Sequence, residues 1–121
     1  MSTQLQICDT TTSGTQQPLF RLTVPTERIT VSDLIRCRVY QEVMDYNQHQ
    51  PAYFRGLVQP VEAKPRQLDW LQQADLAIAA FLNNRFLILV GDRQVSELDE
   101  EIDVLPNQVV TFLRLVPLVG G

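Results

Sequence analysis

The sequence predicts an α+β domain in which short strands accompany one main helix and a second helix. Three patterns support this: apolar and polar residues alternate over 19–24, an apolar stripe with helical spacing runs from Val31 to Tyr46, and two apolar β-rich runs occupy 86–90 and 109–113. With 121 residues, 45% of them hydrophobic and 20% charged, the chain fits one domain with a single core.

Composition also limits the function. The formal net charge of −4 argues against nucleic acid or an anionic membrane surface as a partner. No apolar run approaches the roughly 20 residues of a membrane-spanning helix, and the start at 1–4 lacks the features of a signal peptide. We therefore expect a cytoplasmic protein. Cys8 and Cys37 have no CxxC spacing, so we expect free thiols.

The N-terminal part predicts an antiparallel hairpin. The run 5–8 is β-prone, and the polar stretch 10–17 around Gly14 is typical of a turn region. Phe20, Leu22 and Val24 then alternate with polar residues, as in a half-buried strand.

The main helix is predicted from about Val31 to Tyr46. Thr30 is a suitable N-cap with Asp33 three residues on, and Ile29 and Leu34 have the spacing of a hydrophobic staple. Its apolar stripe comprises Val31, Leu34, Ile35, Val39, Val43 and Tyr46, and we expect Arg36, Arg38, Gln41, Glu42 and Asp45 mostly on the opposite side.

An insert of about 47–84 follows, and its prolines exclude one long element. Residues 53–58 fit a short edge strand, and His49, the only histidine, fits a solvated loop. A second helix is predicted from Pro65 to about Asn83, apolar nearly all round in its second half. Trp70 on it fits either a core anchor or an exposed docking residue.

The C-terminal part predicts three strands. The run 86–90 is followed by a turn at Gly91-Asp92, a short return strand at 93–95 and an acidic loop at 97–103 with Leu98 and Ile102 as apolar plugs. That loop fits a solvated face or a surface for a basic partner. The last strand, 109–113, precedes Pro117, which cannot donate to a strand ladder.

Residues 118–121 are predicted to form a loose tail that ends in Gly120 and Gly121. Neither glycine has a Cβ atom, so the end could pass through a narrow slot in an enzyme that activates its carboxyl group. A frayed terminus of small residues is the alternative. No arrangement of catalytic side chains or phosphate-binding loop is present, so we expect no enzyme, no metal and no bound cofactor.

The order of elements resembles the β-grasp fold of ubiquitin. Residues 86–95 resemble its third strand, glycine turn and return strand, Ile29 and Thr30 resemble the start of its helix, and 109–115 resemble its last strand. The resemblance covers about 4–46 and 85–121 and leaves out the insert. It implies a domain over 1–117, with a mixed sheet of four to five strands on the main helix and the last strand at the sheet centre.

The ending Pro117-x-x-Gly120-Gly121 is similar to that of the molybdopterin and thiamine sulfur carriers, and the chain looks most like bacterial ubiquitin-like proteins linked to phage defence. Those proteins are encoded beside activating enzymes, conjugating enzymes and JAB-type peptidases. The resemblance implies a protein modifier whose activating enzyme uses ATP to adenylate Gly121, for transfer through a thioester to a target protein. A sulfur carrier that forms a C-terminal thiocarboxylate and a β-grasp binding module without conjugation are the alternatives.

The resemblance also assigns roles to single residues. Pro117, Leu118 and Val119 precede the two glycines, and Pro117 and Val119 replace arginines that ubiquitin's activating enzyme reads, which implies a dedicated enzyme. Ile88 occupies the place of ubiquitin's main recognition face, although a strand this apolar also fits burial on both sides. Lys64, the only lysine, is the acceptor expected for self-conjugation. Oligomerisation through the hairpin tip or the insert stays open.

Overall fold

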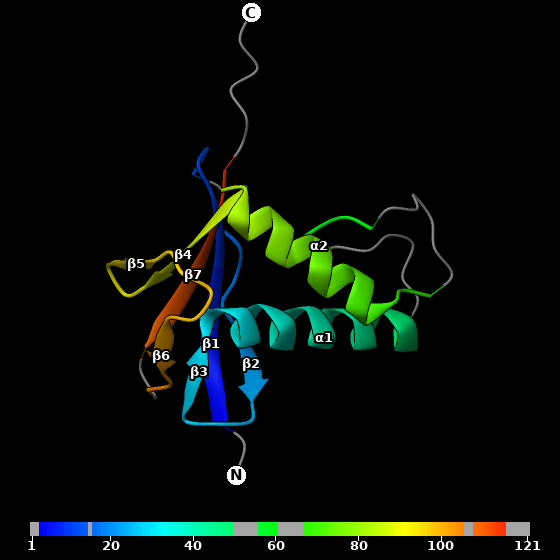
Figure 1. The fold of residues 1–121 in the computed structure, drawn as a ribbon, viewed down its shortest axis with the longest axis horizontal. Helices are drawn as coiled ribbons and strands as arrows, with labels where there is room; N and C mark the ends of the chain where they lie inside the picture. Colours follow the sequence, from blue (N-terminus) through cyan, green and yellow to red (C-terminus); the bar gives the residue numbers. More distant parts are fainter. Residues whose placement is uncertain (1–2, 15, 50–55, 61–66, 106–107, 116–121) are drawn as a thin grey trace, which may run out of the picture.

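The computed structural model describes residues 3–14, 16–49, 56–60, 67–105 and 108–115. Two helices lie together on one side of the strands and extend past them (Figure 1). The elements, in chain order, are β1 (Thr3–Thr11), β2 (Phe20–Val24), β3 (Arg28–Thr30), α1 (Val31–His49), α2 (Trp70–Leu82), β4 (Phe86–Val90), β5 (Arg93–Val95), β6 (Glu101–Asp103) and β7 (Val109–Arg114).

The main sheet is mixed and has five strands in the order β2-β1-β7-β4-β5. The last strand, β7, lies at its centre, parallel to β1 with Ile7 opposite Val110, and antiparallel to β4 with Ile88 opposite Phe112. Gly91 turns β4 into β5 with a φ of 61°, a conformation that favours glycine. The predicted α+β class, the mixed sheet of up to five strands and the central last strand are confirmed.

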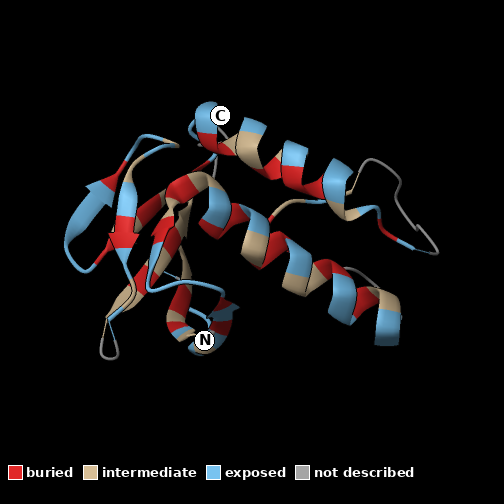
Figure 2. Ribbon diagram, turned by 60° about the horizontal axis from the view of Figure 1, so that its bottom comes forward, coloured by how far each residue is buried: buried red, intermediate tan, exposed pale blue. Residues whose placement is uncertain are grey.

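The core lies between the helices and one face of this sheet. Because side chains alternate along a strand, every second residue points into this layer, and Figure 2 shows buried residues on the sides where helices and strands face one another. The fully buried residues on the strands of this sheet are Leu5, Ile7, Leu22, Val24, Ile88, Val95, Val110 and Phe112. The predicted half-buried strand at 19–24 is thus confirmed from Phe20 onwards.

Helix α1 begins where its capping residues predict. The hydroxyl of Thr30 accepts a hydrogen bond from the N–H of Asp33 at 3.2 Å, and Ile29 and Leu34 are both buried. The helix runs three residues beyond the predicted end, so His49 lies in its last turn and not in a loop; its Nδ1 is 3.0 Å from the carbonyl oxygen of Asp45.

The insert returns to the core through α2. Asp69 caps this helix, and the side-chain amide of Asn47 bonds both backbone groups of Leu68, at 3.0 and 2.8 Å. The described helix begins at Trp70, whereas the predicted start at Pro65 lies outside the described residues. Trp70 is partly buried against the core, with its ring 5.5 Å from that of Tyr40. Of the strand predicted over 53–58, residues 56–58 are described and are not a strand.

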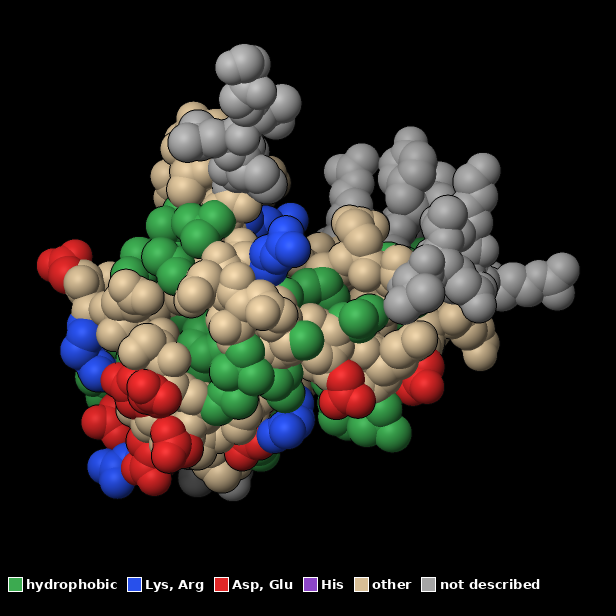
Figure 3. Space-filling view, turned by 45° about the horizontal axis from the view of Figure 1, so that its top comes forward, with side chains coloured by type: hydrophobic (Ala, Val, Ile, Leu, Met, Phe, Trp, Pro, Cys, Tyr) green, Lys and Arg blue, Asp and Glu red, His purple; other side chains and the backbone are tan. Residues whose placement is uncertain are grey.

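The structure also contains a second, two-stranded sheet that the sequence did not predict. β3 and β6 pair antiparallel, with Ile29 opposite Ile102, so the end of the acidic segment is a strand and not a loop. Ile102 is fully buried and Leu98 packs against the core, as expected of apolar plugs. The acids of this segment, Glu97, Asp99, Glu100, Glu101 and Asp103, are exposed or partly exposed, and Figure 3 shows acidic side chains gathered on one side of the molecule.

One edge of the main sheet is closed by a side chain. β2 is the edge strand, and the side chain of Gln41 on α1 donates to the carbonyl oxygen of Arg21 at 3.2 Å and accepts from the N–H of Thr23 at 3.5 Å. The amide therefore bonds the two backbone groups that a neighbouring strand would otherwise meet.

Candidate functional site

Most of the residues predicted to carry function lie outside the described residues. These are Gly120, Gly121, Pro117, Leu118, Val119 and Lys64. The structure describes the base from which the predicted tail departs, namely the end of β7 at Arg114 and Leu115.

This base is held on both sides by backbone hydrogen bonds. The carbonyl oxygen of Arg114 accepts from the N–H of Thr12 at 3.2 Å, and the N–H of Leu115 donates to the carbonyl oxygen of Arg85 at 3.1 Å. Both bonds continue the pairing of β7 with its two neighbours to the last described residue. The final strand thus ends in a firmly anchored position.

The structure corrects the role predicted for Ile88. Its side chain is fully buried in the core, opposite Phe112, so it cannot form part of a surface that an activating enzyme contacts. Because side chains alternate along β4, Leu87 and Leu89 point to the opposite face of the sheet, where they are partly exposed.

A buried ion pair lies at the same end of the core as the base of the tail. Arg38 on α1 is 2% exposed, and its two terminal nitrogens donate to the two carboxylate oxygens of Asp9 on β1, each at 2.6 Å. The guanidinium carbon lies 4.5 Å from the ring centroid of Phe112 and 5.3 Å from that of Phe20. The prediction of Arg38 on the polar side of α1 is wrong, because its charge is satisfied inside the core.

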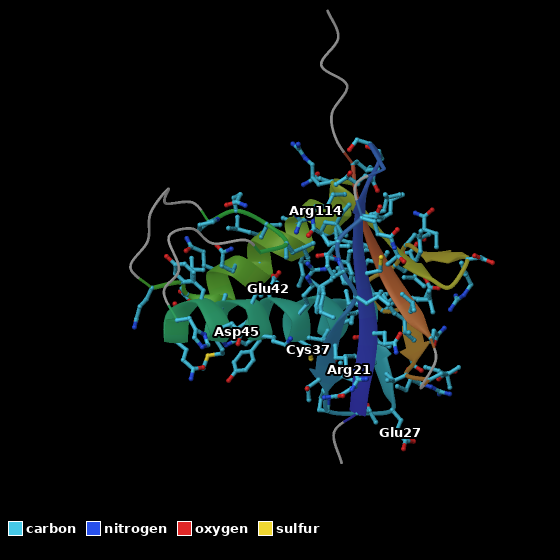
Figure 4. All side chains as sticks on the ribbon, turned by 180° about the vertical axis from the view of Figure 1, so that it is seen from behind. Arg21, Glu27, Cys37, Glu42, Asp45 and Arg114 are labelled. Carbon is cyan, nitrogen blue, oxygen red and sulfur yellow. The ribbon has the colours of Figure 1, made fainter. Side chains whose placement is uncertain are left out.

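A second pair of charged residues holds the insert. The peptide unit between Gly56 and Leu57 is bonded at both ends: Arg114 donates to the Gly56 carbonyl oxygen at 3.0 Å, and Glu42 accepts from the Leu57 N–H at 3.1 Å. Glu42 also lies 3.4 Å from Arg38. These contacts form a continuous series that runs from Asp9 through Arg38 and Glu42 to the insert and then to Arg114. Figure 4 labels Arg114 at the upper end of the sheet and Glu42 on α1 below it.

Burial changes the electrostatics of this series. It raises the pKa of Glu42 above its ordinary value of 4.5, against the effect of the nearby Arg38, which lowers it, and the hydrogen bond from Leu57, which also lowers it. The neutral form of the carboxyl group is thus favoured more than in an exposed glutamate.

A cavity of about 430 Å³ opens at this end of the sheet. Its walls are the end of β1, the returning arm of the hairpin, the insert and the last residue of β7. The lining residues are Asp9, Thr10, Thr11, Gln17, Pro18, Phe20, Gly56, Gln59 and Arg114.

No other chemistry is apparent in the described part of the chain. It contains no group of three or more His, Cys, Asp or Glu side chains arranged to hold a metal ion. Cys8 and Cys37 are free thiols, as predicted. Neither helix in the described residues is both long and apolar enough to cross a membrane.

Comparison with known proteins identifies no relative. No family model matches the chain, and no curated protein and no solved structure matches it significantly. The fold that the structure defines is therefore an α+β domain with a mixed five-stranded sheet and two helices.

The ion pairs that Arg38 makes with Asp9 and Glu42 were not predicted, because helical periodicity alone does not show which charged residues are buried. Arg38 lies between Ile35 and Val39 in the sequence and four residues before Glu42, within the arc that α1 turns toward the sheet. The available signal was on β1, where Asp9 continues the alternation of the buried Leu5 and Ile7. An acid at the third inward position of a strand requires a partner in the core.

Proposed function

We propose that this chain is a ubiquitin-like protein with a β-grasp fold that is joined to target proteins through the carboxyl group of Gly121. One observation carries the proposal: β7 is the central strand of the sheet, bonded on both sides up to Arg114 and Leu115, and the sequence reaches Gly120-Gly121 six residues later. A rigid base followed by a short segment of small and apolar residues suits presentation of a carboxyl group to another protein.

The chemistry belongs to partner enzymes. A carboxylate is a poor electrophile, so an activating enzyme would let the Gly121 carboxylate attack the α-phosphorus of ATP, with release of pyrophosphate. A cysteine thiolate would then attack the acyl-adenylate and AMP would leave, giving a thioester. A conjugating enzyme would pass the acyl group to an amine or hydroxyl group of the target, and a JAB-type peptidase would remove it. This set of partners fits the bacterial ubiquitin-like proteins that the sequence resembles, which are encoded beside such enzymes and are linked to phage defence.

The recognition surface of this proposal differs from the one predicted. The proposed contacts with the activating enzyme still include Pro117, Leu118 and Val119 beside the two glycines. In place of the buried Ile88 we propose surfaces at the end of the sheet. These are the end of β1 at Thr10 and Thr11 and the insert at Gly56 and Gln59, which surround Arg114.

The proposal is tested by intact mass spectrometry after incubation with ATP, magnesium and the adenylating enzyme encoded in the same gene neighbourhood. A modifier gives an enzyme adduct that hydroxylamine cleaves. A sulfur carrier gains one sulfur in exchange for one oxygen when a sulfide donor is added. An unchanged mass with an enzyme that is active on its own substrate contradicts both chemistries.

Two matched variants define the reacting group. Deleting Gly121 should abolish the adduct while leaving the thermal midpoint unchanged, since Gly121 follows the end of β7 at Arg114 by seven residues. Lys64→Arg should keep the adduct with the enzyme and remove any product in which two copies of the chain are joined through Lys64. An adduct that forms equally well without Gly121 rules the proposal out.

A further inference from the structure

The cavity at the end of the sheet has an unbalanced charge. Among the residues that the structure describes, two charged ones line it, Asp9 and Arg114. Both carboxylate oxygens of Asp9 are already bonded to the guanidinium of Arg38 at 2.6 Å. Asp9 therefore presents little net negative charge to the cavity, because its counter-charge is in direct contact.

Within the described part of the chain, Arg114 makes fewer hydrogen bonds than the carboxylate of Asp9 does, and the group that it bonds is uncharged. A guanidinium group has five N–H donors, and among the described residues Arg114 donates one hydrogen bond, to the neutral carbonyl oxygen of Gly56 at 3.0 Å. Its Nε is buried and has no partner among them. The nearest acid in the series, Glu42, directs one oxygen to the Leu57 N–H and the other to Arg38.

The burial that raises the pKa of Glu42 also leaves more of the positive charge of Arg114 uncompensated, because it favours the neutral form of Glu42. The cavity therefore combines a volume of about 430 Å³, a half-buried guanidinium group that makes one hydrogen bond to the described residues, and polar side chains at its rim, including Thr11 and Gln59. Such a site favours a small anion with planar, paired oxygen acceptors.

We propose that this cavity binds a carboxylate group at Arg114. The site goes beyond the proposed function and does not depend on it. The carboxylate can come from an acidic side chain of a protein that grips the end of β7, or from a small free carboxylate. The two sources share the same chemistry at Arg114 and are separated below.

The test is a titration of the ¹⁵N-labelled full chain, followed by amide chemical shifts. Sodium acetate is the probe, and sodium chloride at the same ionic strength and acetamide are the controls. We expect saturable shifts centred on Thr11, Thr12, Gly56 and Leu57, with a dissociation constant on the order of millimolar. Acetamide has the shape of acetate but no charge and should give no saturation.

Two variants link the binding to the cavity. Arg114→Gln removes the cation and should weaken acetate binding by about tenfold or more, whereas Arg21→Gln, on exposed β2, should leave it unchanged. Gln59→Glu places a carboxylate at the rim without altering the contacts of Arg114, so it should compete with acetate even if Arg114→Gln folds poorly. The matched exposed change Gln94→Glu on β5 should have no effect.

The source is distinguished by comparing succinate with N-acetyl-glutamate methylamide, a mimic of a glutamate side chain in a protein. Tighter binding of the blocked glutamate indicates a protein partner, and tighter binding of succinate indicates a free carboxylate. The proposal is overturned if acetate gives no saturable shifts at the cavity, or if Gln59→Glu and Arg114→Gln both bind acetate as the unaltered chain does. Neither result bears on whether Gly121 is adenylated.

Discussion

The guanidinium group of Arg38 is bonded to Asp9 through two 2.6 Å contacts inside a core whose other inward-facing side chains are mostly apolar. A buried pair of this kind couples the two residues strongly, because either charge without the other would lose its closest counter-charge in a poorly polarisable environment.

The first prediction concerns this pair. Asp9→Asn should lower the free energy of unfolding by about 3–5 kcal/mol, since it removes the closest counter-charge of the buried Arg38 and leaves the longer 3.4 Å contact with Glu42. The double change Asp9→Leu with Arg38→Met should recover most of that loss. Urea denaturation measures both, and Asp103→Asn, in the exposed pair with Arg28, serves as the control that should change little. A double variant less stable than Asp9→Asn would contradict the prediction.

The second prediction concerns the pH dependence of stability. Since burial raises the pKa of Glu42 in the folded state, the folded chain holds that proton more tightly than the unfolded chain. The stability that Glu42 contributes is therefore greatest below its ordinary pKa of 4.5 and is lost as the pH rises through the folded value.

Glu42→Gln removes this dependence. The free energy of unfolding of the original chain minus that of Glu42→Gln should fall as the pH rises from about 4.5 towards neutrality. Urea titrations at a series of pH values measure this difference, and Glu27→Gln, at an exposed carboxylate, reports the general effect of removing a charge. A difference that grows with pH would show that Arg38 and Leu57 outweigh burial at Glu42.

The third prediction separates packing from recognition on β4. Ile88→Ala should cost about 2–5 kcal/mol of stability, because it leaves a cavity in the core. Leu89→Ala, at the partly exposed neighbouring position, should cost less than about 1.5 kcal/mol. Thermal unfolding monitored by circular dichroism provides both values, and equal losses would show that the two faces of β4 are buried alike.

The fourth prediction concerns the edge of the sheet. Gln41→Ala frees the outward N–H of Thr23 and carbonyl oxygen of Arg21 on β2, so this edge becomes available for pairing with another chain. Sedimentation velocity should show concentration-dependent self-association of the variant. Gln48→Ala, an exposed change on the same helix, is the control; if both variants sediment alike, the amide of Gln41 does not protect the edge.

Local signals were sufficient for much of the fold. Thr30, Ile29 and Leu34 located the start of α1 because capping depends on neighbouring residues. The alternation at Phe20, Leu22 and Val24 and the continuous apolar run of β4 identified strands in the same way. The central position of β7 was predicted through resemblance, since its own sequence indicates only a buried strand.

Long-range pairings were not predictable by these means. β3 and β6 are three residues each and are joined across the chain, with Arg28 opposite Asp103, so neither has enough residues for a periodic signal. Arg38 and Asp9 each follow an ordinary local pattern, and their partnership depends on the approach of α1 to β1. The charged residues beside the base of the tail are joined by such long-range contacts, which explains why they were missed although the central last strand and the terminal glycines were predicted.

The position of β7 has a consequence for biosynthesis. While the ribosome makes this domain, the β1–β2 pair and the β4–β5 pair are complete before β7 emerges, yet they do not pair with each other in the finished sheet. The strand that joins them is the last to leave the exit tunnel, so a nascent chain that stops before residue 109 holds two separate hairpins and an unfilled core. Folding is thereby delayed until synthesis of the domain is nearly over, and the segment that carries the terminal glycines follows directly behind the strand that completes the fold.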